Sequence, residues 1–358
     1  MNLPDGYCER LRGAWLGRVS GCQLGKPVEL LSMRQGQAAL ERYLDRAGSR
    51  PLRNYIPFVE SEDSEHVVRR WCRQSLRRAE ADDDINYCVL ALQMLERFGS
   101  RLTTEDVARS WLHSLPPAMT FTAERAALKV LLDRGDEMFA YGADPGFDLA
   151  ECSNNGYNTW IGAQIRADLY GWVCPGRPAL AARLVRQDAE LSHRGDGVDG
   201  AVLIAAWGSA MSAEPTLESA LDRALEELPE ESGCREAVAL GRSVVGDRAG
   251  GKAVHDRYVG LSPVATVNNL ALVVWSLLSH PEDFGAAIGE AVAAGLDTDC
   301  NGATVGGLWG LQGLPIPERW TDPWQGRVSV TLAGIGEQRV DDLIARTVAL
   351  TEALAGES

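Results

Sequence analysis

Two short acidic clusters are the residues in this sequence best suited to carry out chemistry. The first, called here the acidic triplet, runs from Asp82 to Asp84 and directly precedes an apolar stretch that begins at Ile85. The second, the acidic pair, is Asp297 and Asp299, in a segment with glycines on both sides. Carboxylates packed so closely repel one another, and hard oxygen ligands suit Mg²⁺ or Mn²⁺. Both clusters are therefore candidate metal ligands.

Each cluster also has an ordinary structural explanation, because Asp is favoured at the start of a helix for capping alone. Capping is the simpler explanation of any single acid of the triplet, although three adjacent acids exceed what a cap requires. In the pair, two carboxylates at positions i and i+2 cannot both be the cap. Gly302, Gly306 and Gly307 follow the pair and allow another backbone to approach closely. A site is the better explanation there.

A binuclear centre forms only if the two clusters meet in the fold. If both helix starts face one another, their carboxylates converge on a point that only metal ions make stable. More than two hundred residues separate Asp84 from Asp297. The sequence alone leaves that meeting open.

The spacing of apolar residues predicts the elements that position these clusters. Apolar residues recur at intervals of three and four, which is typical of amphipathic helices. The stretches are 85–95, 123–132, 179–191, 201–211, 217–228, 264–278, 284–294 and 340–354. Strand-like alternation is nearly absent, and the best candidate strand is 328–332. We expect an all-α fold in a single domain over 1–358, since no linker or shift in composition marks a boundary.

Charge and cysteine usage narrow the class of partner. A formal net charge of -15 disfavours a general nucleic-acid binder, which needs clustered basic residues. The apolar runs are too short to cross a bilayer, so no membrane role is expected. The eight cysteines form no C-x-x-C pair and the first residues are not a signal peptide, which together predict reduced thiols and a cytoplasmic protein.

Three segments of the chain resemble the ADP-ribosylglycohydrolase family, which includes the dinitrogenase reductase-activating glycohydrolase, ADP-ribosylarginine and ADP-ribosylserine hydrolases, and J1-crystallins. The segment 13–29, GAWLGRVSGCQLGKPVE, is similar to the family's opening glycine-rich helix and loop. The acidic triplet falls where the family has Thr/Ser-Asp-Asp, and 297–301, DTDCN, falls where it has Asp-x-Asp-Thr/Ser-Asn. The resemblance covers nearly the whole chain. It implies a compact all-α bundle with two divalent ions, Mg²⁺ or Mn²⁺, in a cleft that receives the ribose hydroxyls.

The resemblance also implies a ligand set, with two departures from the family pattern. Metal ligands are expected at Asp83, Asp84, Asp297 and Asp299, with Asp82 and Cys300 at the family's hydroxyl positions. Asp82 keeps an oxygen ligand and adds charge, which should strengthen cation binding. Cys300 presents a thiol, which is a poor ligand for a hard ion. One of the two metals is therefore expected to be held less tightly, to bind through water, or to be a softer ion. Cys22 stands where the family often has Asp.

Three residues are candidates for catalysis by resemblance: Glu29, Asp84 and Asp297. Glu29 matches the family glutamate on a mobile loop that reaches toward the scissile bond. It is the candidate for positioning or deprotonating the attacking water. Without the resemblance, Glu29 would be interpreted as a solvated loop acid.

Gly162, Arg166 and His193 lie in segments that resemble the family's substrate-side loops. Gly162 and Arg166 occupy what the sequence predicts to be the first turn of a helix, where a phosphate can bind and Arg166 can make a bidentate contact. The alternative for Arg166 is a surface ion pair with Asp168 or Glu151. His193 falls near a ring or polar contact to the family's substrate.

The sequence therefore predicts a metal-dependent hydrolase that cleaves an N- or O-ribosyl bond, removing ADP-ribose from a protein side chain or a small ADP-ribosyl compound. One alternative is a hydrolase of another N-ribosyl metabolite, because the substrate-side loops depart most from the family. The other is a non-enzymatic, crystallin-like relative. The acids at the metal positions argue against the non-enzymatic alternative, whereas Cys22 and Cys300 keep that alternative open.

Overall fold

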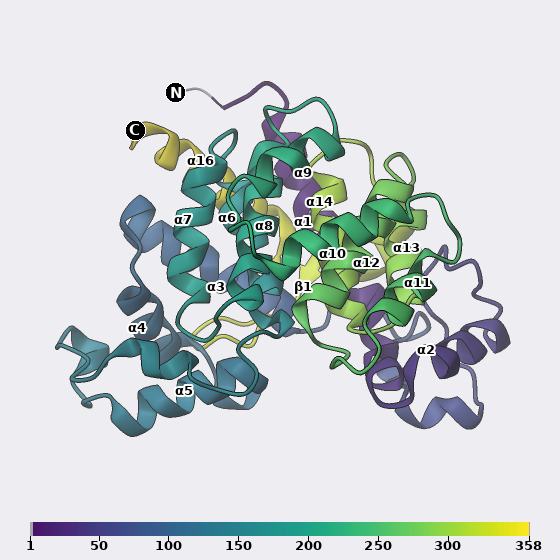
Figure 1. Cartoon of the computed structure of the whole chain (residues 1–358), viewed down its shortest axis with the longest axis horizontal. Coiled ribbons are helices and arrows are strands. Elements are labelled where there is room, and N and C mark those ends of the chain that lie inside the picture. The colour runs from purple at the N-terminus through teal and green to yellow at the C-terminus, as the bar shows by residue number, and fades with distance from the viewer. Residues whose placement is uncertain (1–2, 358) are drawn as a thin grey trace.

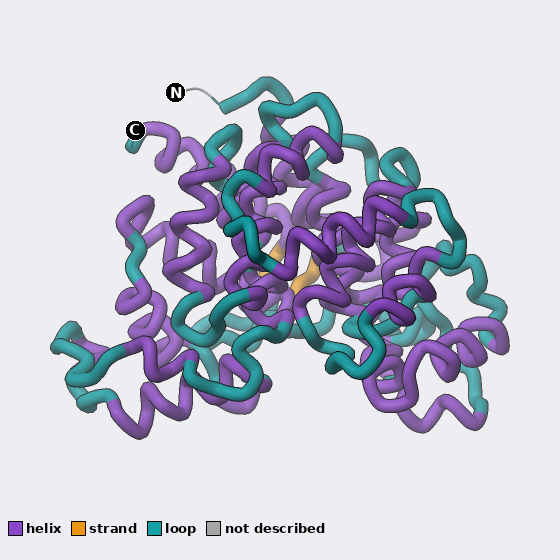
Figure 2. The backbone as a smooth tube through the Cα atoms, in the orientation of Figure 1, coloured by secondary structure: helices purple, strands orange, loops and turns teal. Residues whose placement is uncertain are grey.

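Helices form nearly all the regular structure in the computed structural model, which describes residues 3–357 (Figures 1 and 2). The α-helices are α1 (Tyr7–Gly25), α2 (Glu29–Arg46), α3 (Asp83–Phe98), α4 (Thr104–Ser114), α5 (Thr122–Arg134), α6 (Asp168–Trp172), α7 (Pro178–Ala189), α8 (Asp196–Ala210), α9 (Leu217–Leu225), α10 (Gly233–Ser243), α11 (Gly250–Arg257), α12 (Thr266–Ser279), α13 (Phe284–Ala293), α14 (Thr298–Gly310), α15 (Glu318–Thr321) and α16 (Val340–Gly356). Two short 3-10 helices bear on the site, η1 (Lys26–Val28) and η8 (Ile161–Arg166). The all-α fold class is confirmed.

Each predicted helical stretch overlaps a helix of the structure, whereas the predicted strand is mostly wrong. Only Val328 of 328–332 lies in a strand, β1 (Arg327–Val328), which pairs antiparallel with β2 (Gln338–Arg339). The N–H of Ser329 donates instead to the carbonyl of Ala79, in the segment that leads to α3. The backbone of the predicted strand therefore bonds to an irregular segment and does not lengthen the two-stranded sheet of β1 and β2.

The contact between α1 and α14 lies at the centre of the molecule (Figure 1). From Gly13 to Gly25, every fourth residue of α1 is a glycine, and these glycines face small residues of α14 that run in the opposite direction. The facing residues are Gly13 with Gly310, Gly17 with Gly306, Gly21 with Gly302, and Gly25 with Thr298. A Cβ added at any of these α1 glycines would overlap a carbonyl oxygen of α14. The two backbones therefore touch directly, as the glycines after the acidic pair predicted.

This contact has a direct consequence for the placement of the candidate site residues. Because α1 and α14 are antiparallel, the residues that follow α1 lie beside the residues that begin α14. Lys26 and Glu29 are thereby carried to Asp297 and Asp299, a pairing that no local sequence pattern reveals.

We expect Gly21→Ala to destabilise the fold by about 3 kcal/mol, because the new methyl group has no space beside the Gly302 carbonyl. Denaturant unfolding would measure the loss. Gly156→Ala is the matched control, since a Cβ at Gly156 meets no atom within 4 Å. Equal free energies of unfolding in the two variants would contradict the close approach.

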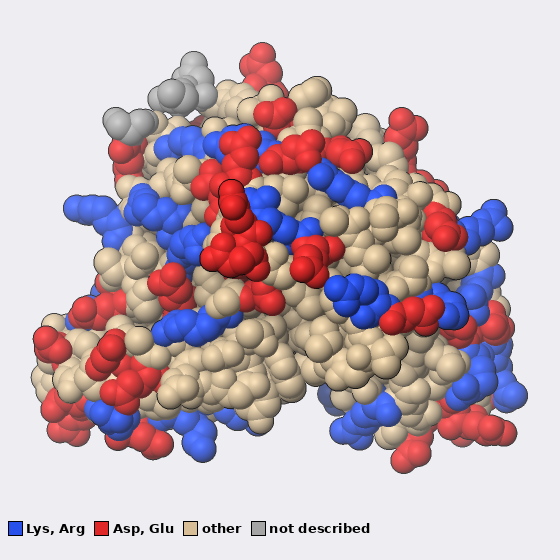
Figure 3. All heavy atoms as spheres, viewed as in Figure 1, with Lys and Arg blue, Asp and Glu red and all other residues tan. Residues whose placement is uncertain are grey.

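The surface mixes both signs of charge on the face shown in Figure 3, where acidic and basic side chains are interspersed. Helices α4 and α5 project on one side of the central helices, and α2 projects on the other (Figures 1 and 2). Among residues 3–357, no helix is both long and apolar enough to cross a membrane. The cysteines in this part of the chain are all free.

Candidate active site

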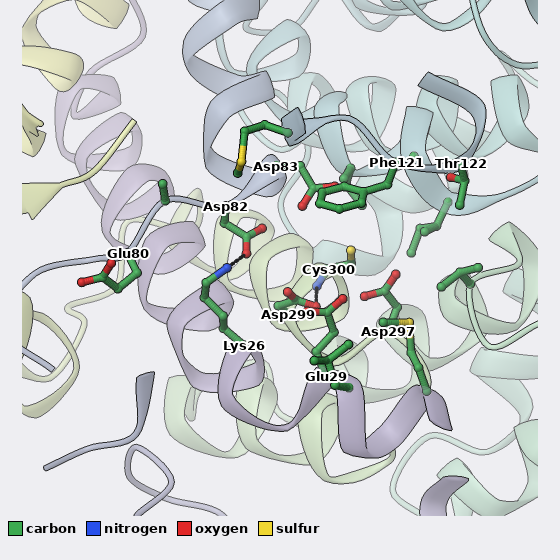
Figure 4. Close-up of a pocket in the computed structure, with 18 of the residues that line it drawn as sticks. Lys26, Glu29, Glu80, Asp82, Asp83, Phe121, Thr122, Asp297, Asp299 and Cys300 are labelled. Atoms are coloured by element: carbon green, nitrogen blue, oxygen red, sulfur yellow. Dashed lines mark hydrogen bonds and ion pairs between the residues drawn. The ribbon is translucent and has the colours of Figure 1, made fainter. Parts of the chain in front are cut away.

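A pocket of about 770 Å³ lies where the α1–α2 junction meets the starts of α3, α5 and α14 (Figure 4). Its polar lining includes Lys26, Glu29, Asp82, Asp83, Asp297, Asp299 and Cys300. Much of the rest is apolar or aromatic, with Met33, Trp71, Met119, Phe121 and Trp160. The pocket thus brings Asp82 and Asp83 of the acidic triplet together with the acidic pair.

One carboxylate oxygen of the acidic pair has no hydrogen-bond partner in the fold. Asp297 occupies the N-cap position of α14, yet its side chain accepts no capping hydrogen bond. Its Oδ1 is buried and has no hydrogen-bond partner. The backbone around it is fixed, because the N–H of Asp297 donates to Asn269 at 3.2 Å and the Thr298 hydroxyl donates to the Gly25 carbonyl at 2.9 Å. Capping therefore does not explain Asp297.

Glu29 completes an all-oxygen group with the acidic pair. One carboxylate oxygen from each of Glu29, Asp297 and Asp299 lies within 4.8 Å of the other two, and Figure 4 shows the side chains converging. Burial and the neighbouring acidic charges raise the pKa of Glu29 and of Asp297 well above their usual values, and raise that of Asp299 to about 6. A divalent cation would relieve this mutual repulsion, so the group fits a hard ion.

The members of the acidic triplet have different environments. Asp82 caps α3, since its side chain accepts from the N–H of Asp84 at 3.0 Å, and it also pairs with Lys26. Asp83 is partly exposed and lines the pocket. Asp84 is fully buried, with Oδ1 at 3.1 Å from the Arg18 guanidinium and Oδ2 without a partner. The capping explanation holds for Asp82 alone.

Lys26 is one of the residues at this site that the sequence reasoning missed. It is 5% exposed, and its ammonium bonds to Asp82 and lies 4.3 Å from the centre of the Trp71 ring. Burial opposes the charge on Lys26, but the Asp82 carboxylate outweighs it and raises the pKa of the lysine. The negative charge of Asp82, which was expected to strengthen metal binding, is therefore balanced by the positive charge of Lys26. The available signal was a lysine three residues before Glu29.

Cys300 faces the carboxylates. Its Sγ lies within 4.8 Å of carboxylate oxygens of Asp84 and Asp299, and the residue lines the pocket. Burial and the nearby acids raise the pKa of the thiol well above its usual value. A neutral thiol is thus placed where an oxygen ligand would serve a hard ion better.

We expect Cys300→Ser to raise the affinity for Mg²⁺ by about tenfold, equivalent to roughly 1.4 kcal/mol, because it adds an oxygen beside Asp299. Calorimetric titration with Mg²⁺ and with Mn²⁺ would measure the change. Cys152→Ser, at a buried cysteine outside the pocket, is the control and should leave both affinities unaltered. A gain in the control, or none at position 300, would contradict the expected role.

Comparison with known proteins agrees with this geometry. The family model described as ADP-ribosylglycohydrolase matches residues 3–354. The chain belongs to the ADP-ribosylglycohydrolase family. A solved structure titled "ADP-ribosylglycohydrolase-related protein complex" has 18% identity and a TM-score of 0.58, with 97% of this chain and 98% of that chain aligned, which shows a shared fold. No curated protein matches significantly. Membership confirms the resemblance and implies a glycohydrolase.

The resemblance places Glu29 on a mobile loop, whereas in the structure Glu29 lies at the start of a helix. It is the first residue of α2, directly after η1, and is helical in the structure. Pro27 lies within η1, and its fixed φ suits the start of a helical turn. The side chain therefore reaches the pocket from a helix start.

Arg166 differs from both sequence interpretations. It ends η8 instead of beginning a helix, and its side chain is buried. Its Nε donates to Asp188 at 3.0 Å, its Nη1 to Glu124 at 2.6 Å, and its Nη2 to Ser192 at 2.8 Å. Every guanidinium nitrogen thus has a protein acceptor. The predicted phosphate contact has no free nitrogen, and the predicted surface ion pairs do not form.

The other two predicted substrate-side residues, Gly162 and His193, differ in their position relative to the pocket. Gly162 lines the pocket and packs directly against the Glu124 carboxylate, which a Cβ would overlap. His193 is fully buried, is not among the pocket-lining residues, and hydrogen-bonds through Nδ1 to Ser192 at 2.8 Å. Burial and the Arg166 charge lower the pKa of His193 well below its usual value. The buried network thus supports Glu124, a pocket acid that the sequence reasoning also missed.

Proposed function

We propose that this protein is a divalent-metal-dependent hydrolase that cleaves an N- or O-ribosyl bond, releasing ADP-ribose from a protein side chain or a small ADP-ribosyl compound. The observation that supports it most is the buried, unbonded Oδ1 of Asp297 beside Glu29 and Asp299 in a pocket of about 770 Å³. Family membership supplies the reaction class.

The proposed chemistry divides between an ion and the chain's own residues. A bound Mg²⁺ or Mn²⁺ would supply positive charge to orient the ribose hydroxyls. Asp297 and Asp299 would hold it, with Asp83 on the same pocket wall. A carboxylate oxygen of Glu29 lies within 4.8 Å of those of Asp297 and Asp299, and in this proposal Glu29 accepts a proton from the attacking water. Bond cleavage passes through an oxocarbenium-like state, which the surrounding carboxylates stabilise.

The rest of the pocket favours an ADP-ribosyl group over a simple ribosyl compound. Phe121 and Trp160 line it, and Tyr157 packs edge-on against Trp160 with 4.8 Å between ring centres. Aromatic faces suit a nucleobase. The exposed side chains of Arg70 and Arg78 also line the pocket and offer positive charge to a diphosphate. This combination replaces the phosphate contact that the sequence assigned to Arg166.

Release of free ADP-ribose tests the proposal. Peptides carrying ADP-ribosylarginine or ADP-ribosylserine, and a nucleoside as the simple N-ribosyl compound, are incubated with the protein and Mn²⁺, and the products are separated by chromatography. We expect ADP-ribose from at least one peptide and no cleavage of the nucleoside. Cleavage of the nucleoside alone would favour the alternative hydrolase. Binding of ADP-ribose without turnover of any of these compounds would favour a crystallin-like relative.

A further inference from the structure

We propose that the ammonium of Lys26 occupies one of the two cation positions that the family resemblance implies, so that the pocket holds a single divalent ion. This inference rests on the proposed function, because it assumes that the pocket binds a metal. It concerns how many ions bind, and it follows from where the structure places fixed positive charge.

Lys26 is fixed in place. Its side chain is almost completely buried, and its ammonium bonds to the Asp82 carboxylate and lies over the Trp71 ring. Lysine is rarely buried unless its charge is paired. Its position is set by the close contact of α1 with α14, because Lys26 directly follows Gly25 at the end of α1. Figure 4 shows the lysine joined to Asp82 within the pocket.

Arg18 provides a second fixed positive charge on the same side of the site. Its Nη2 lies 3.1 Å from Asp84 Oδ1 and its Nη1 lies 2.8 Å from Asp168. The guanidinium also donates to the backbone carbonyls of Asp84 and Ile165. Two members of the acidic triplet are therefore each bonded to a buried basic side chain, so this side has less need of a metal ion.

Two of the three candidate ligand groups differ accordingly, and the third, which is Asp84, Asp299 and Cys300, shares one acid with each of them. Cys22, Asp82 and Asp84 form one group, in which one member is a thiol and both acids are already bonded to basic side chains. A hard ion there would have poor ligands and would be repelled by the ammonium.

Glu29, Asp297 and Asp299 form the other group, which offers only oxygen. Asp297 Oδ1 is buried there without any partner. Asp84 keeps one unpartnered oxygen, Oδ2, and its carboxylate lies within 4.8 Å of that of Asp299, so it adds to the same oxygen set. The single ion therefore belongs beside Asp297.

The number of bound Mn²⁺ ions per chain tests the inference without any enzyme assay. Protein stripped with a chelator is titrated with Mn²⁺ by calorimetry, and the electron paramagnetic resonance spectrum separates an isolated ion from a coupled pair. We expect one isolated ion in the unmodified protein. Lys26→Met removes the ammonium with little change in side-chain length, and we expect this variant to take up a second, coupled ion.

The matched control is Lys252→Met, which removes the lysine of an exposed pair with Asp256 and should leave one isolated ion. Two ions in the unmodified protein would overturn the inference while leaving the proposed metal dependence intact. No ion in the unmodified protein would overturn both. If Lys26→Met also binds one isolated ion, with the helical circular dichroism signal preserved, Lys26 does not exclude the second ion and the inference fails. The count in the unmodified protein decides the matter even if the variant does not fold.

Discussion

Asp297→Asn should lower the affinity for Mn²⁺ by at least about a hundredfold, roughly 2.7 kcal/mol, and abolish turnover while leaving the helical signal intact. The reason is that Asp297 supplies the buried carboxylate oxygen for which the protein itself provides no hydrogen-bond donor. Calorimetry with Mn²⁺ and Mg²⁺, together with a turnover assay, measures both losses.

The same substitution should have the opposite effect on the metal-free protein. Asp297 lies within 4.8 Å of carboxylate oxygens of Glu29 and Asp299, so loss of its charge relieves repulsion. We expect Tm in the presence of a chelator to rise by about 1–4 °C. A misfolded variant would instead show a lower Tm.

Asp199→Asn is the matched control for Asp297→Asn. Asp199 is also largely buried at the start of a helix, the first turn of α8, but it does not line the candidate pocket. Its substitution should leave Mn²⁺ affinity unchanged. Unchanged affinity in Asp297→Asn as well would remove Asp297 from the metal site.

The acidic clusters could be found from sequence because their residue types are costly to place together without a purpose. Three adjacent Asp residues exceed what a helix cap needs, and in the structure only Asp82 acts as a cap. The glycines around the acidic pair pointed to close backbone contact, which α1 provides. These features are local in sequence, so they could be interpreted without knowledge of the fold.

The features that sequence reasoning missed depend on long-range contacts. Helix α1 is buried on nearly all sides, so its apolar residues show no single face, and only the family resemblance indicated a helix there. The pairing of Lys26 with Asp82 joins residues that are 56 positions apart. No periodicity in the sequence encodes that contact.

Arg166 and His193 show a different limit of sequence reasoning. Both are polar residues in or near loops rich in glycine and asparagine, a context that suggested solvent and substrate. In the structure they belong to a buried network with Glu124, Asp188 and Ser192. Burial of a charged side chain is possible only when its partners are supplied from several elements, and those partners are identified only by the fold.

Glu29→Gln should lower kcat by about 10²–10⁴-fold and leave KM within about threefold of the original value. A residue that accepts a proton from the attacking water acts in the transition state, whereas the amide of glutamine cannot serve as a base. The position of Glu29 at the start of α2, beside Asp297 and Asp299, is consistent with this role. Steady-state kinetics at saturating Mn²⁺ would measure both constants.

Two further measurements separate this role from the others that the geometry allows. Glu80→Gln removes a carboxylate from the same pocket, at a residue paired with Arg78, and should change kcat little. If Glu29 is chiefly a metal ligand, Glu29→Gln should weaken Mn²⁺ binding, and excess Mn²⁺ should restore kcat. If it is a base, kcat stays low at every Mn²⁺ concentration, because metal does not replace a missing proton acceptor. A parallel loss in kcat and KM would assign Glu29 to substrate contact, and no loss in either would make it an ordinary acid of the helix start.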